Sequence, residues 1–528
     1  MSASKTELSV TVPAGATSGK ISVSNAKGTT SSAQDFKIGN QLAPVITSFT
    51  PTIGTRGTAV TINGSNFAAD RAGNKASFGN MLGNVSSAAA DKLVATVPGA
   101  GASGKIGVTT ANGRGISSDD FYAVPTGVNV ADIEYTGRLQ VGAPPQPVNI
   151  VNPGKKALLL FDGTPRDLLT LVSSGGNFAS SVSITAYRND GTSFHSAGLS
   201  AASAVDLPAL PAGGTYTLIL SPGSSDKGRI DLQLKPEARG ALVLDGDALQ
   251  VTLTPGQNGR YTFTGRAGQG VGLGYLNVAT VPASQSIYYR VFNPDGTQLF
   301  SDSWSNSNSN TLPLLPVNGS YALQVDPSGI ASASLQLIAS SDLTGQLVAD
   351  GPALSFNTSR VGQNGRYTFS GTAGQKFWLT FSNAAFASGA SVRVLKPDGS
   401  ALDSSSVSTG VSNMDIQALP VAGTYTVLID PSGLTVGKVD IQLKSVPADK
   451  TGTIEINGAA LPLELAVHQK AAVTFSGTAG QRLGLGIPAW RRCRPTRAST
   501  TPSTSLTARS CSATAGVRTT AIICQPCR

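Results

Sequence analysis

The most reactive side chains in this sequence are its four cysteines, and all of them lie at or beyond position 493. Cys524 and Cys527 have the C-x-x-C spacing of many zinc and redox sites. A zinc site needs further ligands, but no second pair and no neighbouring histidine accompanies these two. We therefore predict that the cysteines form neither a metal site nor a redox centre.

Histidine is the usual general base of a hydrolytic triad, and the sequence has only His195 and His468. His195 follows a turn in GTSFHSAG, and His468 lies in the strand-like segment AVHQKAAVTF. No H-E-x-x-H motif and no G-x-S-x-G nucleophile elbow is present. We predict that both histidines are surface or edge residues, that the chain has no catalytic residue and that it is not an enzyme.

A glycine-rich segment, Gly268–Gly274, reads GQGVGLG and is similar to a phosphate-binding loop. The dinucleotide fingerprint G-x-G-x-x-G requires a different third spacing and a strand followed by a helix. The segment AGQRLGLG at Ala479–Gly486 has the same strand-turn-strand context. We therefore interpret both segments as turns and expect no nucleotide cofactor.

Four loop aspartates supply the oxygen ligands that calcium prefers, at Asp295, Asp326, Asp398 and Asp430. They are far apart in the sequence and no D-x-D-x-D-G cluster is present. We expect turn-forming roles and no metal ligand, with calcium as the one cofactor alternative left open.

Trp304 and Trp378 have side chains that can stack on a sugar ring. They do not occupy equivalent positions in the repeats described below. We therefore favour a core or ordinary surface role for both, and no binding residue is assigned.

The net charge of +9 is concentrated at one end of the chain. Residues 490–528 contain seven arginines, no lysine and no acid, which leaves 32 basic against 30 acidic residues elsewhere. A basic patch for nucleic acid would depend entirely on this tail. We predict no nucleic-acid partner. No apolar run is long enough for a membrane span or a signal peptide.

The sequence GQNGRYTF occurs twice, at Gly256–Phe263 and 106 residues later at Gly362–Phe369. A related segment, AVTF at Ala472–Phe475, is followed after one serine by GTAGQ, and Phe369 is followed after one serine by the same five residues. This period is too long for a solenoid unit and indicates a series of small complete domains.

Residues 42–124 alternate apolar and polar positions with Pro-x-x-Gly and Asn-Gly turns between them, which predicts β-strands. Residues 7–36 match residues 92–121 at an offset of 85, so the chain is expected to begin inside a domain. Both segments resemble the IPT/TIG family, which implies an immunoglobulin-like fold. The positions that carry the resemblance are Pro44, Ile46, Phe49, Pro51, Gly54, Gly57, Val60, Ile62, Gly64, Phe67, Phe78, Gly79, Val97, Pro98, Gly104 and Val108.

A second kind of repeat begins near Gly137 and combines an R-Y-T-F strand, an Asp-Gly turn and a tyrosine strand. Asp-Gly between alternating strands predicts a hairpin. This pattern resembles the bacterial pre-peptidase C-terminal (PPC) domain, which implies a jelly-roll-like β-sandwich. The turns contain Asp190, Asp295 and Asp398, and the tyrosine strands contain Tyr216, Tyr321 and Tyr425.

The composition changes abruptly near Trp490. When codons permitted for 490–512 are read one base earlier, one choice gives LAAVPADASVNYTVYKPDGTVLF, which is similar to residues 278–300 of the second repeat. We therefore expect a frameshift at or just before Trp490, followed by an unstructured tail.

Together these features predict an all-β array of immunoglobulin-like and jelly-roll-like β-sandwich domains with a disordered C-terminal tail. We expect a non-catalytic bacterial cell-surface or secreted protein, a fragment that acts as a spacer, adhesion or ligand-recognition array. The partner would be a protein or a glycan, and the modules monomeric units of a longer chain. The alternative is an accessory region of a larger secreted hydrolase or toxin. A resemblance to the N-terminal regions of RHS/YD-repeat surface proteins is also considered, although no YD repeat is present.

The expected units are a half IPT/TIG domain (1–38), a complete one (42–124), repeat 1 (126–236), repeat 2 (238–341), repeat 3 (343–446), a truncated repeat 4 (450–489) and the tail (490–528).

Overall fold

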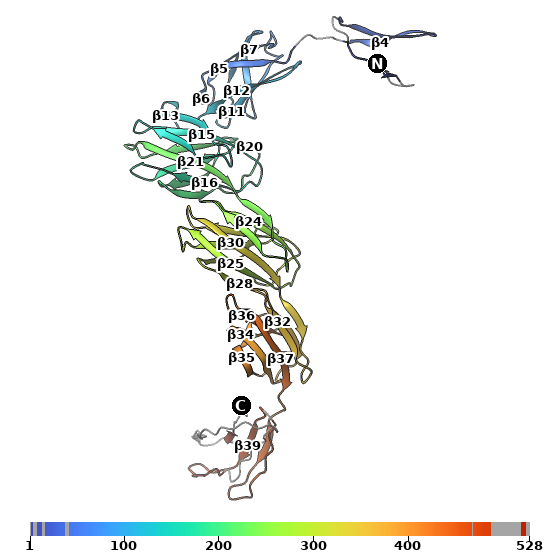
Figure 1. Cartoon of the computed structure of the whole chain (residues 1–528), viewed down its shortest axis with the longest axis vertical. Helices are drawn as coiled ribbons and strands as arrows, with labels where there is room; N and C mark the ends of the chain where they lie inside the picture. The colour runs from blue at the N-terminus through green and yellow to red at the C-terminus, as the bar shows by residue number, and fades with distance from the viewer. Residues whose placement is uncertain are drawn as a thin grey trace.

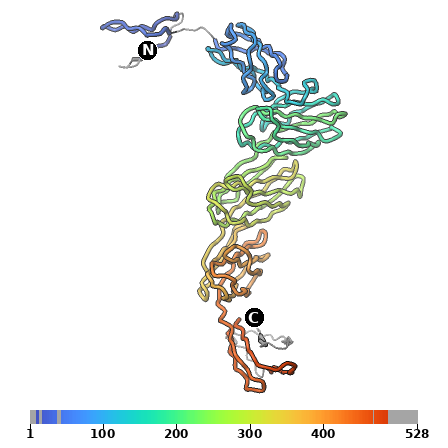
Figure 2. The backbone as a smooth tube through the Cα atoms, turned by 180° about the vertical axis from the view of Figure 1, so that it is seen from behind, coloured from blue at the N-terminus to red at the C-terminus, as the bar shows by residue number. Residues whose placement is uncertain are grey.

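The computed structural model describes residues 2–3, 8–12, 16–36, 42–466, 468–486 and 519–523. Figure 1 shows β-sheet domains that follow one another along a single extended line, and Figure 2 shows the same arrangement from behind. The predicted all-β fold is confirmed, because the one helical segment among these residues is a single 3-10 turn, η1 (Val130–Asp132). No helix in the described ranges is long and apolar enough to cross a membrane.

The immunoglobulin-like domain, residues 42–124, has eight strands in the order β5-β7-β10-β9-β8-β11-β12-β6. β9 pairs with β10 on one side and with β8 on the other, so it joins the two layers around the core. Phe78 and Phe121 are fully buried there, with their ring centroids 5.2 Å apart in an edge contact. The strands are β5 (Val45–Thr50), β6 (Ile53–Gly54), β7 (Ala59–Ser65), β8 (Lys75–Phe78), β9 (Met81–Ala88), β10 (Lys92–Thr96), β11 (Gly104–Thr110) and β12 (Gly113–Ala123).

The N-terminal residues form the hairpin of β3 (Gly19–Asn25) and β4 (Gly28–Phe36), preceded by β1 (Ser2–Ala3) and β2 (Leu8–Ser9). Its register matches that of β11 and β12, including the irregularity after Lys20 and Lys105. Ile21, Val23 and Phe36 are each more than 40% exposed, whereas Ile106, Val108 and Phe121 are fully buried at the matching positions. Residues that form a core in the complete domain are therefore exposed in this hairpin.

Repeats 1 and 2 are two-layer sandwiches, each with a five-stranded and a four-stranded sheet in the same order. In repeat 1 the sheets are β13-β15-β20-β17-β18 and β14-β21-β16-β19. In repeat 2 they are β22-β24-β29-β26-β27 and β23-β30-β25-β28. In each of these repeats the first strand pairs in parallel with the third strand, β13 with β15 and β22 with β24. The segments before and after the second strand therefore lie side by side.

The strands of repeat 1 are β13 (Ile133–Arg138), β14 (Gln146–Ile150), β15 (Lys156–Gly163), β16 (Leu169–Ser174), β17 (Val182–Tyr187), β18 (Ser193–Leu199), β19 (Ser203–Asp206), β20 (Gly214–Ser221) and β21 (Gly228–Pro236). Those of repeat 2 are β22 (Ala238–Ala241), β23 (Leu249–Leu253), β24 (Gly259–Gly265), β25 (Val271–Val281), β26 (Ile287–Phe292), β27 (Gln298–Trp304), β28 (Asn308–Thr311), β29 (Gly319–Pro327) and β30 (Ser332–Ser341).

Repeat 3 has the same plan, but its two sheets are joined. The 19-residue β34 covers the positions of both β25 and β26, and β35 covers those of β27 and β28. Pro282 lies between β25 and β26 in repeat 2, where it cannot donate to a ladder. Repeats 1 and 3 have no proline there, and the sheets are separate in repeat 1, so the proline alone does not account for the difference. Its strands are β31 (Leu343–Gln346), β32 (Leu354–Thr358), β33 (Gly365–Gly371), β34 (Phe377–Leu395), β35 (Ala401–Ile416), β36 (Gly423–Pro431) and β37 (Gly437–Ser445).

The same aromatic pair marks the core of each repeat. The buried rings of Phe161 and Tyr216, Phe263 and Tyr321, and Phe369 and Tyr425 are stacked with centroids 5.2, 5.5 and 5.4 Å apart. Each tyrosine hydroxyl donates to the carbonyl oxygen four residues earlier, at 2.6 to 2.7 Å. The hydrogen bond satisfies a hydroxyl that would otherwise be buried at a cost, and it fixes the loop before the tyrosine strand.

Beyond repeat 3, β38 (Lys450–Thr453) pairs in parallel with β39 (Ala471–Phe475), as the first strand does in each repeat. The predicted disordered tail, residues 490–528, lies outside the described residues apart from 519–523. Those five residues form β40 (Thr519–Ile523), which pairs antiparallel with β39.

Candidate functional site

The two histidines lie in different domains. His195 is on β18, and its Nε2 is buried without a hydrogen-bond partner. His468 follows repeat 3, where Nδ1 is 2.8 Å from Asp415 Oδ1 and the ring lies 4.4 Å from that of Trp378. Within the described residues, no serine or threonine hydroxyl is hydrogen-bonded to either ring.

The aspartates considered as calcium ligands all have partners within the protein. Asp295 and Asp398 each accept a backbone N–H and a hydroxyl from the residue two positions later, at 2.6 to 2.9 Å. Those bonds lower the pKa of both carboxyls. Asp326 and Asp430 face arginines across the sheet. No group of three or more potential metal ligands occurs in the part of the chain that the structure describes. Cys524 and Cys527 lie outside it.

Both tryptophans are partly buried and contact other residues. Trp304 packs against the core of repeat 2, and its Nε1–H donates to Asn310 Oδ1 at 3.1 Å. Asn310 in turn donates to Asp302 at 2.7 Å. Trp378 lies against His468, as described above. Both indoles therefore have partners within the protein.

The repeated phrase GQNGRYTF proves to be the segment through which one repeat contacts the preceding one. Gly256 and Gly362 both have positive φ, at 68° and 79°. A Cβ on Gly362 would lie 2.7 Å from the carbonyl oxygen of Leu273 in repeat 2, and one on Gly272 would lie 1.6 Å from the carbonyl oxygen of Gly362. The glycine-rich segment at 268–274 is therefore a turn followed by a strand, as predicted, and its Gly272 allows this backbone approach.

The asparagine of the phrase reaches into the preceding repeat. Asn258 Nδ2 donates to Asp206 Oδ1 at 2.8 Å, and Asn364 Nδ2 donates to Thr311 Oγ1 at 3.1 Å. The glutamine beside it donates to the carbonyl oxygen of the last strand residue of that repeat, at 3.2 and 3.1 Å. Arg360 adds a bond of 2.8 Å to the carbonyl oxygen of Gly246. The sequence feature that could have indicated this contact is the exact repetition of GQNGRYTF at 256–263 and 362–369.

The arginine of the phrase holds the connector between repeats. β21 ends at Pro236 and β22 begins at Ala238, and β30 ends at Ser341 and β31 begins at Leu343, so each connector is a single residue. These residues, Glu237 and Asp342, are buried and lie 2.9 Å from Arg260 and Arg366. Burial raises the pKa of Glu237, although Arg260 acts in the opposite direction.

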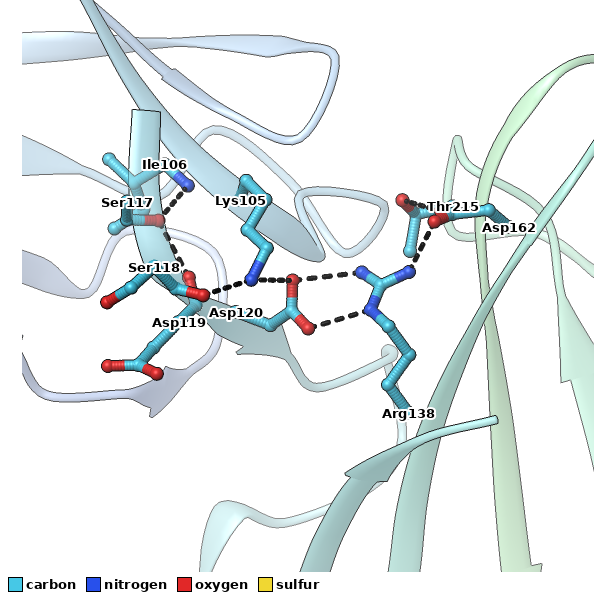
Figure 3. Close-up of polar contacts among 9 residues, drawn as sticks. All are labelled: Lys105, Ile106, Ser117, Ser118, Asp119, Asp120, Arg138, Asp162 and Thr215. Carbon is cyan, nitrogen blue, oxygen red and sulfur yellow. Dashed lines mark hydrogen bonds and ion pairs between the residues drawn. The ribbon is translucent and has the colours of Figure 1, made fainter. Parts of the chain in front are cut away.

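A corresponding arginine joins the immunoglobulin-like domain to repeat 1 (Figure 3). Arg138 donates two hydrogen bonds to the largely buried Asp120, at 2.7 and 2.9 Å, and a third to Asp162 at 2.6 Å. Beside it, Val124, Leu158, Leu160 and Ile219 form a small buried cluster that spans the junction. Charge-assisted bonds and apolar burial therefore act together there.

The junction between repeats 2 and 3 also contains a polar groove of about 370 Å³. Figure 1 shows β28 at the end of repeat 2 that faces repeat 3. The groove-lining side chains used below are those of Ser309, Asn310, Thr311, Ser391, Arg393 and Asp430. We call this space the junction groove.

The equivalent place at the junction of repeats 1 and 2 has a bulkier residue. Tyr288 pairs with Asp326 as Ser391 pairs with Asp430, so Tyr288 and Ser391 occupy matching positions. Arg290 lies 2.8 Å from Asp326, whereas Arg393 lies 3.9 Å from Asp430. Burial raises the pKa of both aspartates. The arginine–aspartate pair is therefore longer in the junction groove than at the related junction.

These features define an array of β-sandwich domains joined by short, ion-paired connectors. Residues 44–123 match the family model of the IPT/TIG domain, which confirms that prediction for this part of the chain. A search of curated proteins found no match.

Among solved structures, an auxiliary nutrient binding protein from Bacteroides thetaiotaomicron is 27% identical over 15% of this chain and 21% of its own, with a TM-score of 0.15. The chain thus covers about a fifth of that protein. SGBP-B from a complex xyloglucan utilization locus in Bacteroides uniformis is 13% identical over 62% of this chain and 81% of its own, with a TM-score of 0.16. At these TM-scores neither likeness carries an argument about function.

Proposed function

We propose that residues 42–446 form a non-catalytic, extended arm that spaces and presents binding surfaces outside a bacterial cell. The observation that carries the proposal is the one-residue connector between repeats, held by an arginine from the next domain. A flexible linker samples many orientations, whereas a single buried and ion-paired residue leaves few. The secreted or cell-surface location and the PPC-like nature of the repeats are part of the proposal.

The contacts on both sides of each connector support this role. The glutamine, asparagine and arginine of the repeated phrase all bind across or beside the junction. Domain interfaces within one chain ordinarily permit relative motion unless they are well packed. Keeping the same contacting residues at two successive junctions favours a fixed orientation, which is what a spacer requires.

Small-angle X-ray scattering of the purified chain tests the arm. Inserting a short Gly-Ser linker after Glu237 and after Asp342 should increase flexibility and reduce the mean end-to-end dimension. The matched control is the same insertion after Gly296, in the exposed turn between β26 and β27, which should leave the profile unchanged. Equal profiles for connector and control insertions would contradict the proposal. Hydrolysis of a protein or glycoside substrate by the chain alone would contradict its non-catalytic part.

A further inference from the structure

We propose that the junction groove between repeats 2 and 3 binds a neutral pyranose unit of a glycan. The inference rests on the proposed arm only for the fixed placement of the two domains. Ligand sites commonly lie between domains, and pockets for small molecules start at about 300 Å³. At about 370 Å³, the junction groove is large enough for a compact ligand.

The lining of the groove matches a ligand rich in hydroxyl groups. Ser309, Thr311 and Ser391 contribute hydroxyls, and the remaining groups include the guanidinium of Arg393 and the carboxylate of Asp430. The Ser309 hydroxyl already donates to the carbonyl oxygen of Gly433 across the junction, at 2.7 Å, so the two walls are tied together. Hydroxyls can both donate and accept, which suits a polyol with the same property.

Asp430 and Arg393 are more loosely paired than Asp326 and Arg290 in repeat 2, and Asp430 also has a hydrogen bond with Thr311. Their closest charged atoms are 3.9 Å apart, and their side chains are 30% and 44% exposed. Of two adjacent sugar hydroxyls, one can donate to the carboxylate while the other accepts from the guanidinium. This geometry favours a ring with neighbouring hydroxyl groups.

The balance of charge in the groove selects against ionic ligands. Arg393 would attract an anion that Asp430 repels, and Asp430 would attract a cation that Arg393 repels, so an ionic ligand gains little net charge interaction for the hydration that it loses. The groove offers no broad apolar surface of the kind that a protein partner buries, because its lining is mainly polar. A neutral hydroxylated ring is therefore the occupant that fits both the size and the charge.

Two further features pre-arrange the site. Asn310 is held by Trp304 and Asp302, at 3.1 and 2.7 Å, so its position on the wall is fixed. Behind Thr311 lies the fully buried Asn364, whose Nδ2 donates to Thr311 Oγ1 at 3.1 Å and so holds that side chain. Fixed polar groups reduce the entropy lost on binding.

Saturation-transfer NMR of the full chain with the methyl glycosides of D-glucose, D-galactose and D-mannose tests the proposal, with D-glucuronate as the charged comparison. At least one neutral glycoside should receive saturation, and glucuronate should not. Ser391→Tyr should weaken binding by about tenfold or more, because it fills the groove with the residue that repeat 2 has there. Asp430→Asn should weaken it because the amide replaces the charged acceptor.

Ser183→Tyr is the matched control, since Ser183 is the exposed residue at the corresponding place in repeat 1. It should leave binding unchanged. Saturation of none of the neutral glycosides, binding that Ser391→Tyr and Asp430→Asn leave intact, or equal loss in Ser183→Tyr would overturn the proposal. The small-angle scattering profile is recorded on the same samples. Loss of binding with an unchanged profile points to the groove, whereas a profile that indicates flexible domains points to the arm.

Discussion

Replacing Arg138 with alanine should loosen the junction between the immunoglobulin-like domain and repeat 1. Arg138 is the central residue of that contact because it binds Asp120 from one domain and Asp162 from the other (Figure 3). After its removal Asp120, whose side chain is 7% exposed, keeps one charged neighbour among the described residues, Lys105 at 3.7 Å. The variant therefore leaves a mostly buried carboxylate without its main partner.

The size of the effect follows from that burial. Removing one partner of a fully buried ion pair costs about 3–5 kcal/mol, and removing one from an exposed pair costs about 0–1 kcal/mol. Arg138 is 20% exposed and Lys105 remains, so we expect about 2 kcal/mol. That corresponds to roughly a 30-fold shift from the docked to the undocked arrangement. The apolar cluster around Leu160 is unchanged, so partial docking should persist.

Spin-label distance measurements provide the assay. The described body of the chain has no cysteine, so replacing the four in the tail with serine allows labels to be placed at Ala89 and Ser224, in exposed turns of the two domains. We expect a narrow distance distribution for the parent and a broad one for Arg138→Ala. Arg229→Ala, which removes an exposed pair with Asp231 inside repeat 1, is the control and should keep the narrow distribution. If Arg138→Ala is as narrow as its parent, the ion network does not fix the junction.

Three further predictions concern the repeats. Tyr425→Phe should lower the stability of repeat 3 by about 1–2 kcal/mol in chemical denaturation, because it removes the 2.7 Å bond to the Val421 carbonyl oxygen, while the exposed Tyr288→Phe should have little effect. Tyr275→Phe should raise the stability of repeat 2 by roughly 1 kcal/mol, because the buried hydroxyl of Tyr275 has no hydrogen-bond partner in the described structure. Repeat 3 has a phenylalanine, Phe381, at the matching position. A loss of stability in the variant would show that the hydroxyl does form a hydrogen bond. Hydrogen bonds from Ser400 lower the pKa of Asp398, so at low pH the unfolded chain binds more protons than the folded chain. The stability of repeat 3 should therefore fall as the pH drops below 3.8, the ordinary pKa of an aspartate. In Asp398→Asn the melting temperature should fall less steeply over this acid range, and equal slopes in variant and parent would contradict the prediction.

The sequence was sufficient to predict the strands because the determinants of a strand are local. Alternating burial in β24, where Tyr261 and Phe263 face the core, repeats the alternation of the residues themselves. The Asp-Gly turns at Asp190, Asp295 and Asp398 join the hairpins that they predicted. The fusion of the sheets in repeat 3 was not predicted, since it depends on how β34 bends across both layers.

The junctions were missed because their contacts join residues far apart in the sequence. Asn258 and Asp206 are brought together only after two separate domains have folded and been oriented. No alternation or turn pattern encodes such a pair. The contact of His468 with Asp415 was missed for the same reason, because the two residues lie in different units. His468 lies where the other units have a glycine, with φ of 61°, and contacts Asp415 across the next junction.

The repeated phrase also explains how an arm of this kind can differ in what it binds. Its glutamine, asparagine and arginine fix one domain on the next, and these are the residues that repeats 2 and 3 share. The groove at the junction is lined both by residues that the repeats share, Arg393 and Asp430, and by residues that they do not share, such as Ser391 in place of Tyr288. Ser309 and Thr311 also take part in contacts across the junction, so the lining position that can change most freely is the one that Ser391 and Tyr288 occupy. Tyr288→Ser is therefore expected to open a groove between repeats 1 and 2 while the scattering profile stays the same.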